Sequence, residues 1–140
     1  MPAQSILYRL FGIGGVPATA MAALRQEGLV LVEEGVRGWI TYRNFRAPGK
    51  RSSYRVSWFV GSLVITQARF AAFTFSKPIV NIALEAEWLE KLRCELEGDS
   101  RLLVTFEAAT FDTAASGTIE CRFTTPKAHL FIDQIRARAS

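Results

Sequence analysis

The chain has only one histidine and two cysteines among its 140 residues. The histidine, His129, has no compelling nucleophile near it in the sequence, so no Ser-His-Asp triad is indicated. The cysteines have neither zinc-ligand nor redox spacing, and the aspartates are too dispersed to indicate a metal site. No stretch approaches the roughly 20 apolar residues of a membrane-spanning helix. We therefore expect a protein without catalytic activity, metal or cofactor.

The two cysteines, Cys94 and Cys121, lie in alternating runs in which their apolar neighbours share their parity. Both thiols should then point into the core as free cysteines, which suits a reducing compartment. Residues 10–24 form an uncharged run with some features of a signal peptide, but three glycines and a proline interrupt it. We therefore expect a cytoplasmic protein rather than an exported one.

Composition places the chain among single globular domains. Hydrophobic residues make up 49% and charged residues 21% of the sequence, a balance typical of folded rather than disordered proteins. A chain of this length buries roughly two-thirds of its extended-state surface, which is enough for an autonomous core. Ten phenylalanines, three tryptophans and three tyrosines provide the material for that core.

The first 27 residues predict a helical extension, with a short helix over residues 5–11 and a second from Pro17 to about Gln26. From Gly28 the sequence changes to short runs rich in β-branched and aromatic residues, which predict strands. Turn residues separate these runs, at Gly35, Pro48-Gly49, Gly61 and Lys77-Pro78. Residues 28–140 are therefore expected to form one β domain. A short helix is also indicated near residues 86–92.

The C-terminal part predicts a hairpin and a closing helix. Gly98-Asp99 is a recognisable turn between two alternating runs. After the last predicted strand, Thr125 and Pro126 have the residue types of a helix N-cap and first position. An amphipathic helix is expected over residues 126–138, with its apolar face formed by Ala128, Phe131, Ile132, Ile135 and Ala139. The total is seven or eight strands followed by one helix.

This element order resembles the pleckstrin-homology-like superfamily, with bacterial and GRAM-type members as the nearest comparison. The resemblance covers residues 28–139 and implies an antiparallel barrel or sandwich of about seven strands with a C-terminal helix. In lipid-binding relatives, a Lys, a spacer, then Arg or Lys, one residue and Arg hold the headgroup. Here the nearest stretch is Lys50-Arg51 followed by Arg55, with a different spacing. A calycin-like barrel would give much of the same pattern.

Positive charge is concentrated between Arg37 and Arg55, a segment with six basic residues and no acidic one. The whole chain has a net charge of +4, so the remaining residues sum to −2 (11 basic and 13 acidic). A turn at Pro48-Gly49 would make this segment a hairpin in which opposed residue numbers sum to 97. Trp39 would then lie opposite Trp58, Tyr42 opposite Arg55 and Arg46 opposite Arg51, with the aromatic side chains interleaved among the charges.

The predicted function is surface recognition through this basic hairpin. The residues expected to bind an anionic lipid headgroup or an acidic protein partner are Arg43, Arg46, Lys50, Arg51 and Arg55. Guanidinium groups suit phosphate because their planar fork forms paired, charge-assisted hydrogen bonds. The simplest alternative is that these are solvated charges that protect a strand edge. Nucleic acid is disfavoured because no recognisable nucleic-acid module is present.

Two other interpretations stay open. An acidic stretch from Glu85 to Asp99 could match the basic hairpin head to tail, which would make the chain an oligomerising scaffold. Alternatively, the aromatic-rich strands could line a cavity in a small-ligand carrier. A filled interior would argue against the carrier, whereas an apolar cavity of several hundred Å³ would favour it.

Overall fold

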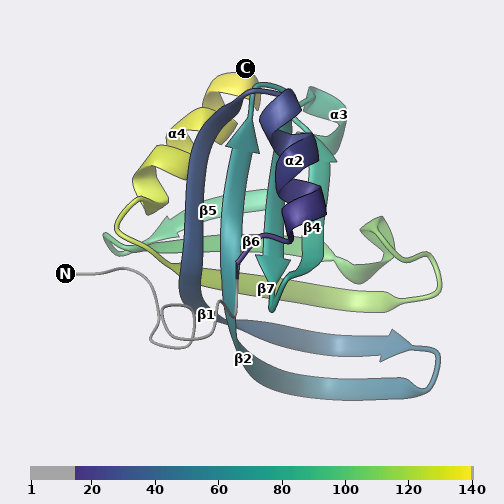
Figure 1. Cartoon of the computed structure of the whole chain (residues 1–140). Coiled ribbons are helices and arrows are strands. Elements are labelled where there is room, and N and C mark those ends of the chain that lie inside the picture. Colours follow the sequence, from purple (N-terminus) through teal and green to yellow (C-terminus); the bar gives the residue numbers. More distant parts are fainter. Residues whose placement is uncertain (1–14, 140) are drawn as a thin grey trace.

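The structure is a computed structural model that describes residues 15–139. Its seven strands form one antiparallel sheet, curled into a half-barrel, in the order β4-β3-β2-β1-β7-β6-β5 (Figure 1). The strands are β1 (Leu29–Ala47), β2 (Lys50–Thr66), β3 (Arg69–Thr74), β4 (Lys77–Ala83), β5 (Arg93–Glu97), β6 (Arg101–Glu107) and β7 (Ser116–Thr124). The helices are α2 (Ala18–Gln26), α3 (Ala86–Leu89) and α4 (Ala128–Ala139), with a 3₁₀ turn at Ala108–Thr110. The predicted class, mostly β with about seven strands and a C-terminal helix, is confirmed.

The first two strands are longer than predicted, because two glycines expected to end strands lie inside them. Gly35, with φ 71°, lies in β1 at a register shift between Glu34 and Val36. Gly61 lies in β2, where a Cβ would come within 2.0 Å of the Phe73 carbonyl oxygen. Glycine therefore permits a left-handed backbone conformation inside β1 and a close approach of β3 to β2. The predicted breaks were wrong, and the helix predicted over residues 5–11 lies outside the described residues.

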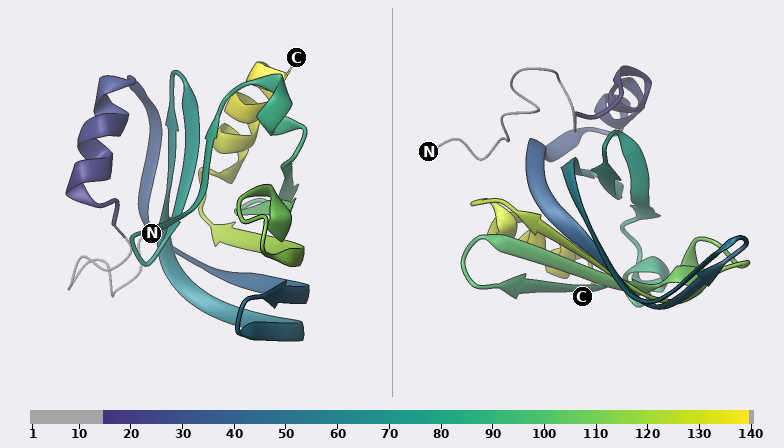
Figure 2. Two further views of the ribbon diagram at one scale, coloured as in Figure 1. Left: turned by 90° about the vertical axis from the view of Figure 1, so that its right-hand side faces the viewer. Right: turned by 90° about the horizontal axis from the view of Figure 1, so that it is seen from below.

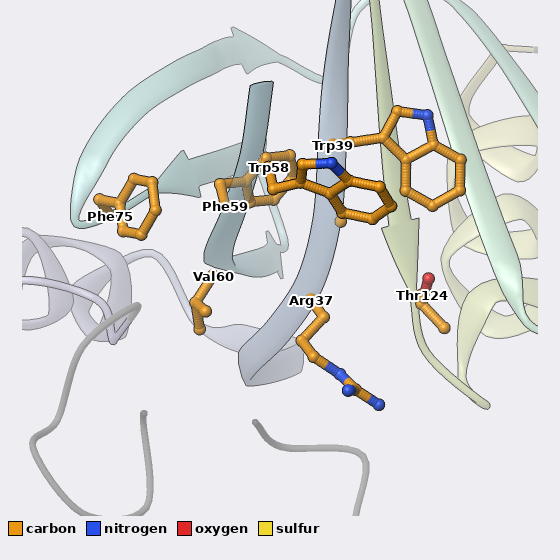
Figure 3. Close-up of a pocket in the computed structure, with 8 residues that line it drawn as sticks. Arg37, Trp39, Trp58, Phe59, Val60, Phe75 and Thr124 are labelled. Atoms are coloured by element: carbon orange, nitrogen blue, oxygen red, sulfur yellow. The ribbon is translucent and has the colours of Figure 1, made fainter. Parts of the chain in front are cut away.

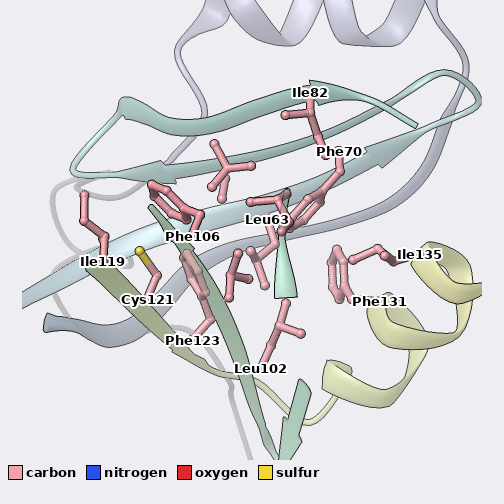
Figure 4. Close-up of a cluster of buried hydrophobic side chains, with 14 of the residues drawn as sticks. Leu63, Phe70, Ile82, Leu102, Phe106, Ile119, Cys121, Phe123, Phe131 and Ile135 are labelled. Atoms are coloured by element: carbon pink, nitrogen blue, oxygen red, sulfur yellow. The ribbon is translucent and has the colours of Figure 1, made fainter. Parts of the chain in front are cut away.

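Two apolar clusters cover the two faces of the sheet. The larger cluster fills the concave side, where α4 contributes Phe131 and Ile135 against sheet residues such as Leu63 and Phe123 (Figure 4). The smaller cluster lies on the opposite face beneath α2, where Leu24 joins residues of β2 and β3. Figure 2 shows α2 and α4 on opposite sides of the sheet. The lower parts of β1 and β2 extend beyond both helices as a projecting hairpin.

The predicted cap of the last helix has a second, tertiary role. The Thr125 hydroxyl accepts a hydrogen bond from the Lys127 backbone N–H (3.1 Å) and donates one to the Glu33 carboxylate in β1 (3.0 Å). Thr125 is fully buried, so both hydrogen-bonding functions of its hydroxyl are satisfied inside the protein. The regular helix begins at Ala128, two residues later than predicted.

The end of α2 is joined to the sheet by an ion pair. The Glu27 carboxylate accepts hydrogen bonds from the Arg69 guanidinium at 3.1–3.2 Å and from the Thr66 hydroxyl at 3.0 Å. The hydrogen bonds from Arg69 lower the pKa of Glu27 from its ordinary value, against an opposing effect of burial. This contact makes α2 part of the packed domain.

Both cysteines are free thiols, as predicted. Cys94 pairs with Val104, which in turn pairs with Cys121, so β6 separates the two cysteines. A disulfide between them is therefore excluded by the strand order. Burial raises the pKa of the Cys94 thiol to about 12 and also raises that of Cys121.

Candidate functional site

The β1–β2 hairpin has the register that the sequence predicted. Trp39 pairs with Trp58, and the register continues to Ala47 opposite Lys50 around the Pro48-Gly49 turn. Gly49 has φ 75° and no atom within 4 Å of where a Cβ would lie, so glycine serves the turn rather than the packing. On its other edge, β1 pairs with β7 as far as Arg46 opposite Ser116. β7 therefore supports the hairpin from one side only.

The end of the hairpin holds a hollow of about 360 Å³, which we call the basic hollow. Three of the five predicted binding residues line it: Lys50, Arg51 and Arg55, all exposed to solvent. The other lining residues are Tyr42, Phe45, Gly49 and Ser52. None of the described residues in this lining is acidic. The basic hollow therefore combines three cationic groups with two hydroxyl groups, a set of donors that suits an anion.

Tyr42 and Phe45 form the aromatic wall of the basic hollow, with ring centroids 5.1 Å apart. Both side chains are half-buried against the main core. They share a face because Asn44, with φ 51°, interrupts the strand alternation between them. Burial raises the pKa of the Tyr42 hydroxyl, and the positive charge of Arg55 opposes that effect. The wall is thus fixed by packing, whereas the basic side chains reach into solvent.

The other two predicted residues lie apart from the basic hollow. Arg46 lines an adjoining hollow of about 240 Å³, together with Arg51 and Ser52. The guanidinium of Arg43 instead donates to the Glu120 carboxylate of β7 at 3.1 Å and lies over the Tyr54 ring. Arg43 is therefore an ion-paired residue of the sheet surface.

Charge pairing continues across β7. Burial opposes ionisation of Glu120, but its hydrogen bonds with Arg43 and Arg122 outweigh that effect, so the pKa of Glu120 lies below its ordinary value. Arg122 also donates to Glu97 at 3.0 Å. One carboxylate of the acidic stretch, Glu97, is therefore paired within the domain.

The sequence did not predict a second hollow on the convex face, which we call the aromatic groove. It has a volume of about 410 Å³, and Figure 3 shows its lining residues: Arg37, Gly38, Trp39, Trp58, Phe59, Val60, Phe75 and Thr124. The Trp39 and Trp58 rings lie 5.0 Å apart, and the Arg101 guanidinium lies 4.7 Å from the Trp39 ring centroid. The predicted pairing of Trp39 with Trp58 was the only feature of the sequence that pointed to this groove. Nothing in the sequence indicated that Phe75, which lies in a distant turn, would join them.

The small-ligand carrier receives no support from these hollows. The concave side is filled by fully buried side chains that include Phe70, Phe123 and Phe131. The apolar hollow of several hundred Å³ opens instead on the convex face, between the hairpin and the β3–β4 turn. His129 is exposed on α4. Within residues 15–139, no cluster of three or more His, Cys, Asp or Glu residues could hold a metal ion.

No protein-family model and no curated protein sequence matches the chain. None of the helices in residues 15–139 is both long and apolar enough to span a membrane.

Proposed function

We propose that this domain is a non-enzymatic, cytoplasmic recognition module that binds phosphate groups of an anionic membrane surface through the basic hollow. The observation that carries the proposal is the convergence of Lys50, Arg51 and Arg55 on one hollow at the end of a projecting hairpin. A lipid phosphate can accept hydrogen bonds from two guanidinium groups, an ammonium group and the Ser52 hydroxyl. The half-buried wall of Tyr42 and Phe45 fixes the backbone that presents them.

The affinity expected for a single domain is low. Each basic residue near an anionic bilayer contributes about 1 kcal/mol. The basic hollow and Arg46 together provide four such residues, so the attraction is about 4 kcal/mol, which corresponds to a millimolar-range dissociation constant. A single domain would therefore be recruited reversibly, and its membrane binding should be sensitive to salt.

The element order supports a pleckstrin-homology-like assignment, which we include in the proposal. Seven antiparallel strands precede one closing helix, and the basic residues lie on the first two strands of the sheet and their connecting turn. In lipid-binding relatives the same region holds the headgroup. Because the spacing of Lys50, Arg51 and Arg55 differs from their pattern, we infer recognition of a general phosphate group rather than of one phosphoinositide.

The proposal is tested by sedimenting the full chain with vesicles of phosphatidylcholine that contain increasing fractions of phosphatidylserine, at low and at physiological salt. We expect binding that rises with the anionic fraction, falls with salt and disappears in Lys50→Glu/Arg51→Glu. The matched control is Lys77→Glu/Lys127→Glu, which makes the same charge change at two exposed lysines that do not line the basic hollow. Equal loss in both variants would mean that net charge, and not the basic hollow, causes binding.

Titration with inorganic phosphate distinguishes a membrane surface from a soluble phosphate compound. Binding of inorganic phosphate that depends on Lys50 and Arg51, without any binding to vesicles, would assign the hollow to a soluble ligand. Absence of binding to both probes at low salt would contradict the proposal and leave the charges with a protective role at the strand edge.

A further inference from the structure

β2 has an open edge beside the aromatic groove. β3 pairs with β2 only from Gly61 to Ile65, and one more hydrogen bond joins the Phe75 backbone N–H to the Val60 carbonyl (2.9 Å). Among residues 15–139, no strand pairs with this side of β2 between Lys50 and Phe59. The lower strand of the hairpin in Figure 1 therefore ends the sheet on that side. We call this stretch the open edge.

Period-two alternation identifies the backbone groups that face outward from the open edge. The Val60 carbonyl points toward β3, so the N–H and C=O groups of Trp58, Val56 and Tyr54 point in the same direction. The side chains of these three residues are 70%, 38% and 61% exposed, respectively. An edge with free donors, free acceptors and exposed apolar side chains is a template for pairing with another extended chain.

The positive charge of the open edge indicates which kind of chain would bind there. Lys50, Arg51 and Arg55 lie along it, and Arg37 lies in the lining of the aromatic groove. Pairing with the same edge of a second copy would add further positive charge to this edge and would bring like charges closer. A segment with acidic side chains would meet opposite charges instead. Charge complementarity therefore favours an acidic partner segment over a second copy.

We propose that an extended acidic segment of a partner protein adds to the open edge as an eighth strand. Its backbone forms hydrogen bonds with Tyr54, Val56 and Trp58, and its acidic side chains lie near Arg55. One apolar side chain of the segment enters the aromatic groove, which lies where the Phe75 turn closes the open edge. Backbone pairing supplies affinity, and the groove supplies side-chain selectivity. This interaction needs no phosphate, so it goes beyond the membrane proposal.

The probe is a fluorescein-labelled synthetic peptide of nine residues that alternates Glu with Val and has one central Phe. Fluorescence anisotropy with the full chain should show saturable binding that weakens as salt rises. Two further peptides have the same sequence but are N-methylated at alternate residues. One is methylated at the odd-numbered amides and the other at the even-numbered amides, so each has lost the N–H donors of one edge. A fourth peptide has Lys in place of Glu. We expect one methylated peptide and the Lys peptide to bind at least about tenfold more weakly, the equivalent of one or two backbone hydrogen bonds.

Substitutions in the protein, rather than in the peptide, test the same contacts. Val56→Pro removes one outward N–H without removing a hydrogen bond to β1, because proline is tolerated where the N–H faces away from the sheet. Val56→Thr is its matched control, since it keeps the N–H and a β-branched side chain. We expect Val56→Pro to weaken peptide binding about tenfold and Val56→Thr to leave it nearly unchanged. Trp58→Thr tests the aromatic groove with the backbone intact, and circular dichroism verifies the fold of each variant.

Three results would overturn the proposal. If both methylated peptides bind as tightly as the unmethylated peptide, the open edge forms no backbone hydrogen bonds with the peptide. Absence of peptide binding to the well-folded full chain at low salt would show that no acidic strand is accepted. A dimer in sedimentation equilibrium that Val56→Pro dissociates would assign the open edge to a second copy. Because Val56→Pro leaves the basic hollow intact, vesicle binding by that variant is expected to persist and separates this proposal from the membrane proposal.

Discussion

The closing helix should contribute a large share of the stability of the domain through one side chain, Phe131. This residue is 0% exposed and lies on α4 against the concave face of the sheet (Figure 4). An aromatic side chain buries about 150–250 Å², which at about 25 cal/mol per Å² corresponds to ~4–6 kcal/mol. Alanine retains part of that contact, so Phe131→Ala should lower the free energy of unfolding by about 3–5 kcal/mol.

The neighbouring residue provides the matched control. Leu130 is 38% exposed on the same helix, so Leu130→Ala makes the same kind of truncation with little loss of burial. We expect it to lower the free energy of unfolding by less than about 1 kcal/mol. Domains of this kind have a free energy of unfolding of only about 5–15 kcal/mol. The decrease expected for Phe131→Ala is therefore a large fraction of the stability of the domain.

Urea denaturation of the two variants, followed by circular dichroism and tryptophan fluorescence, measures the difference. A loss at Phe131 no larger than that at Leu130 would refute the packing of α4 against the concave face. By the same reasoning, truncation of the chain before Thr125 should abolish cooperative unfolding, because the concave cluster would then be exposed to water. A cooperative native-like transition in the truncated chain would contradict this description of the core.

Three further predictions concern charge and thiol chemistry. Lys50→Glu/Arg51→Glu should change the free energy of unfolding by no more than about 0.5 kcal/mol per site in urea denaturation, because both side chains are exposed; a larger loss would make the basic hollow structural. The pKa of Glu27 is lower in the folded state, so its ion pair stabilises the domain above pH 4.5 and is lost as pH falls through the folded pKa. Stability of Glu27→Gln should therefore depend less on pH below pH 4.5, and an unchanged acid limb would argue against the ion pair. Because burial raises the pKa of both Cys94 and Cys121, neither thiol should react with a disulfide reagent at pH 8 until denaturant is added; rapid reaction of the native protein would contradict the burial of Cys121 and the partial burial of Cys94.

The hairpin register could be predicted from the sequence because the turn fixes it. A two-residue loop at Pro48-Gly49 leaves one pairing for two long strands, and every opposed pair then follows. The basic hollow could be predicted only in part. Lys50, Arg51 and Arg55 were named, but Tyr42 and Phe45 share a face only because Asn44 takes a left-handed conformation. Local sequence does not specify such a break in alternation.

Contacts with segments outside the hairpin determine whether its other basic side chains are ion-paired. Arg43 lies on the hairpin, and β7 brings the Glu120 carboxylate beside it across 77 residues of chain. The aromatic groove depends in the same way on Phe75, which reaches Trp58 through the β3–β4 turn. Ion pairs and hollows between distant segments have no local signature, so sequence patterns do not reveal them.

The class of fold, the last helix with its Thr125 cap, the hairpin register and the inward thiols could all be predicted from the sequence, because each follows from short-range periodicity and turn chemistry. It took the packing of distant strands to place Gly35 and Gly61 inside continuous strands, and to leave one edge of β2 open between Lys50 and Phe59, where β3 no longer pairs with it. Whether a glycine ends a strand or relieves a close approach depends on what packs across from it. That contact exists only after distant strands have come together.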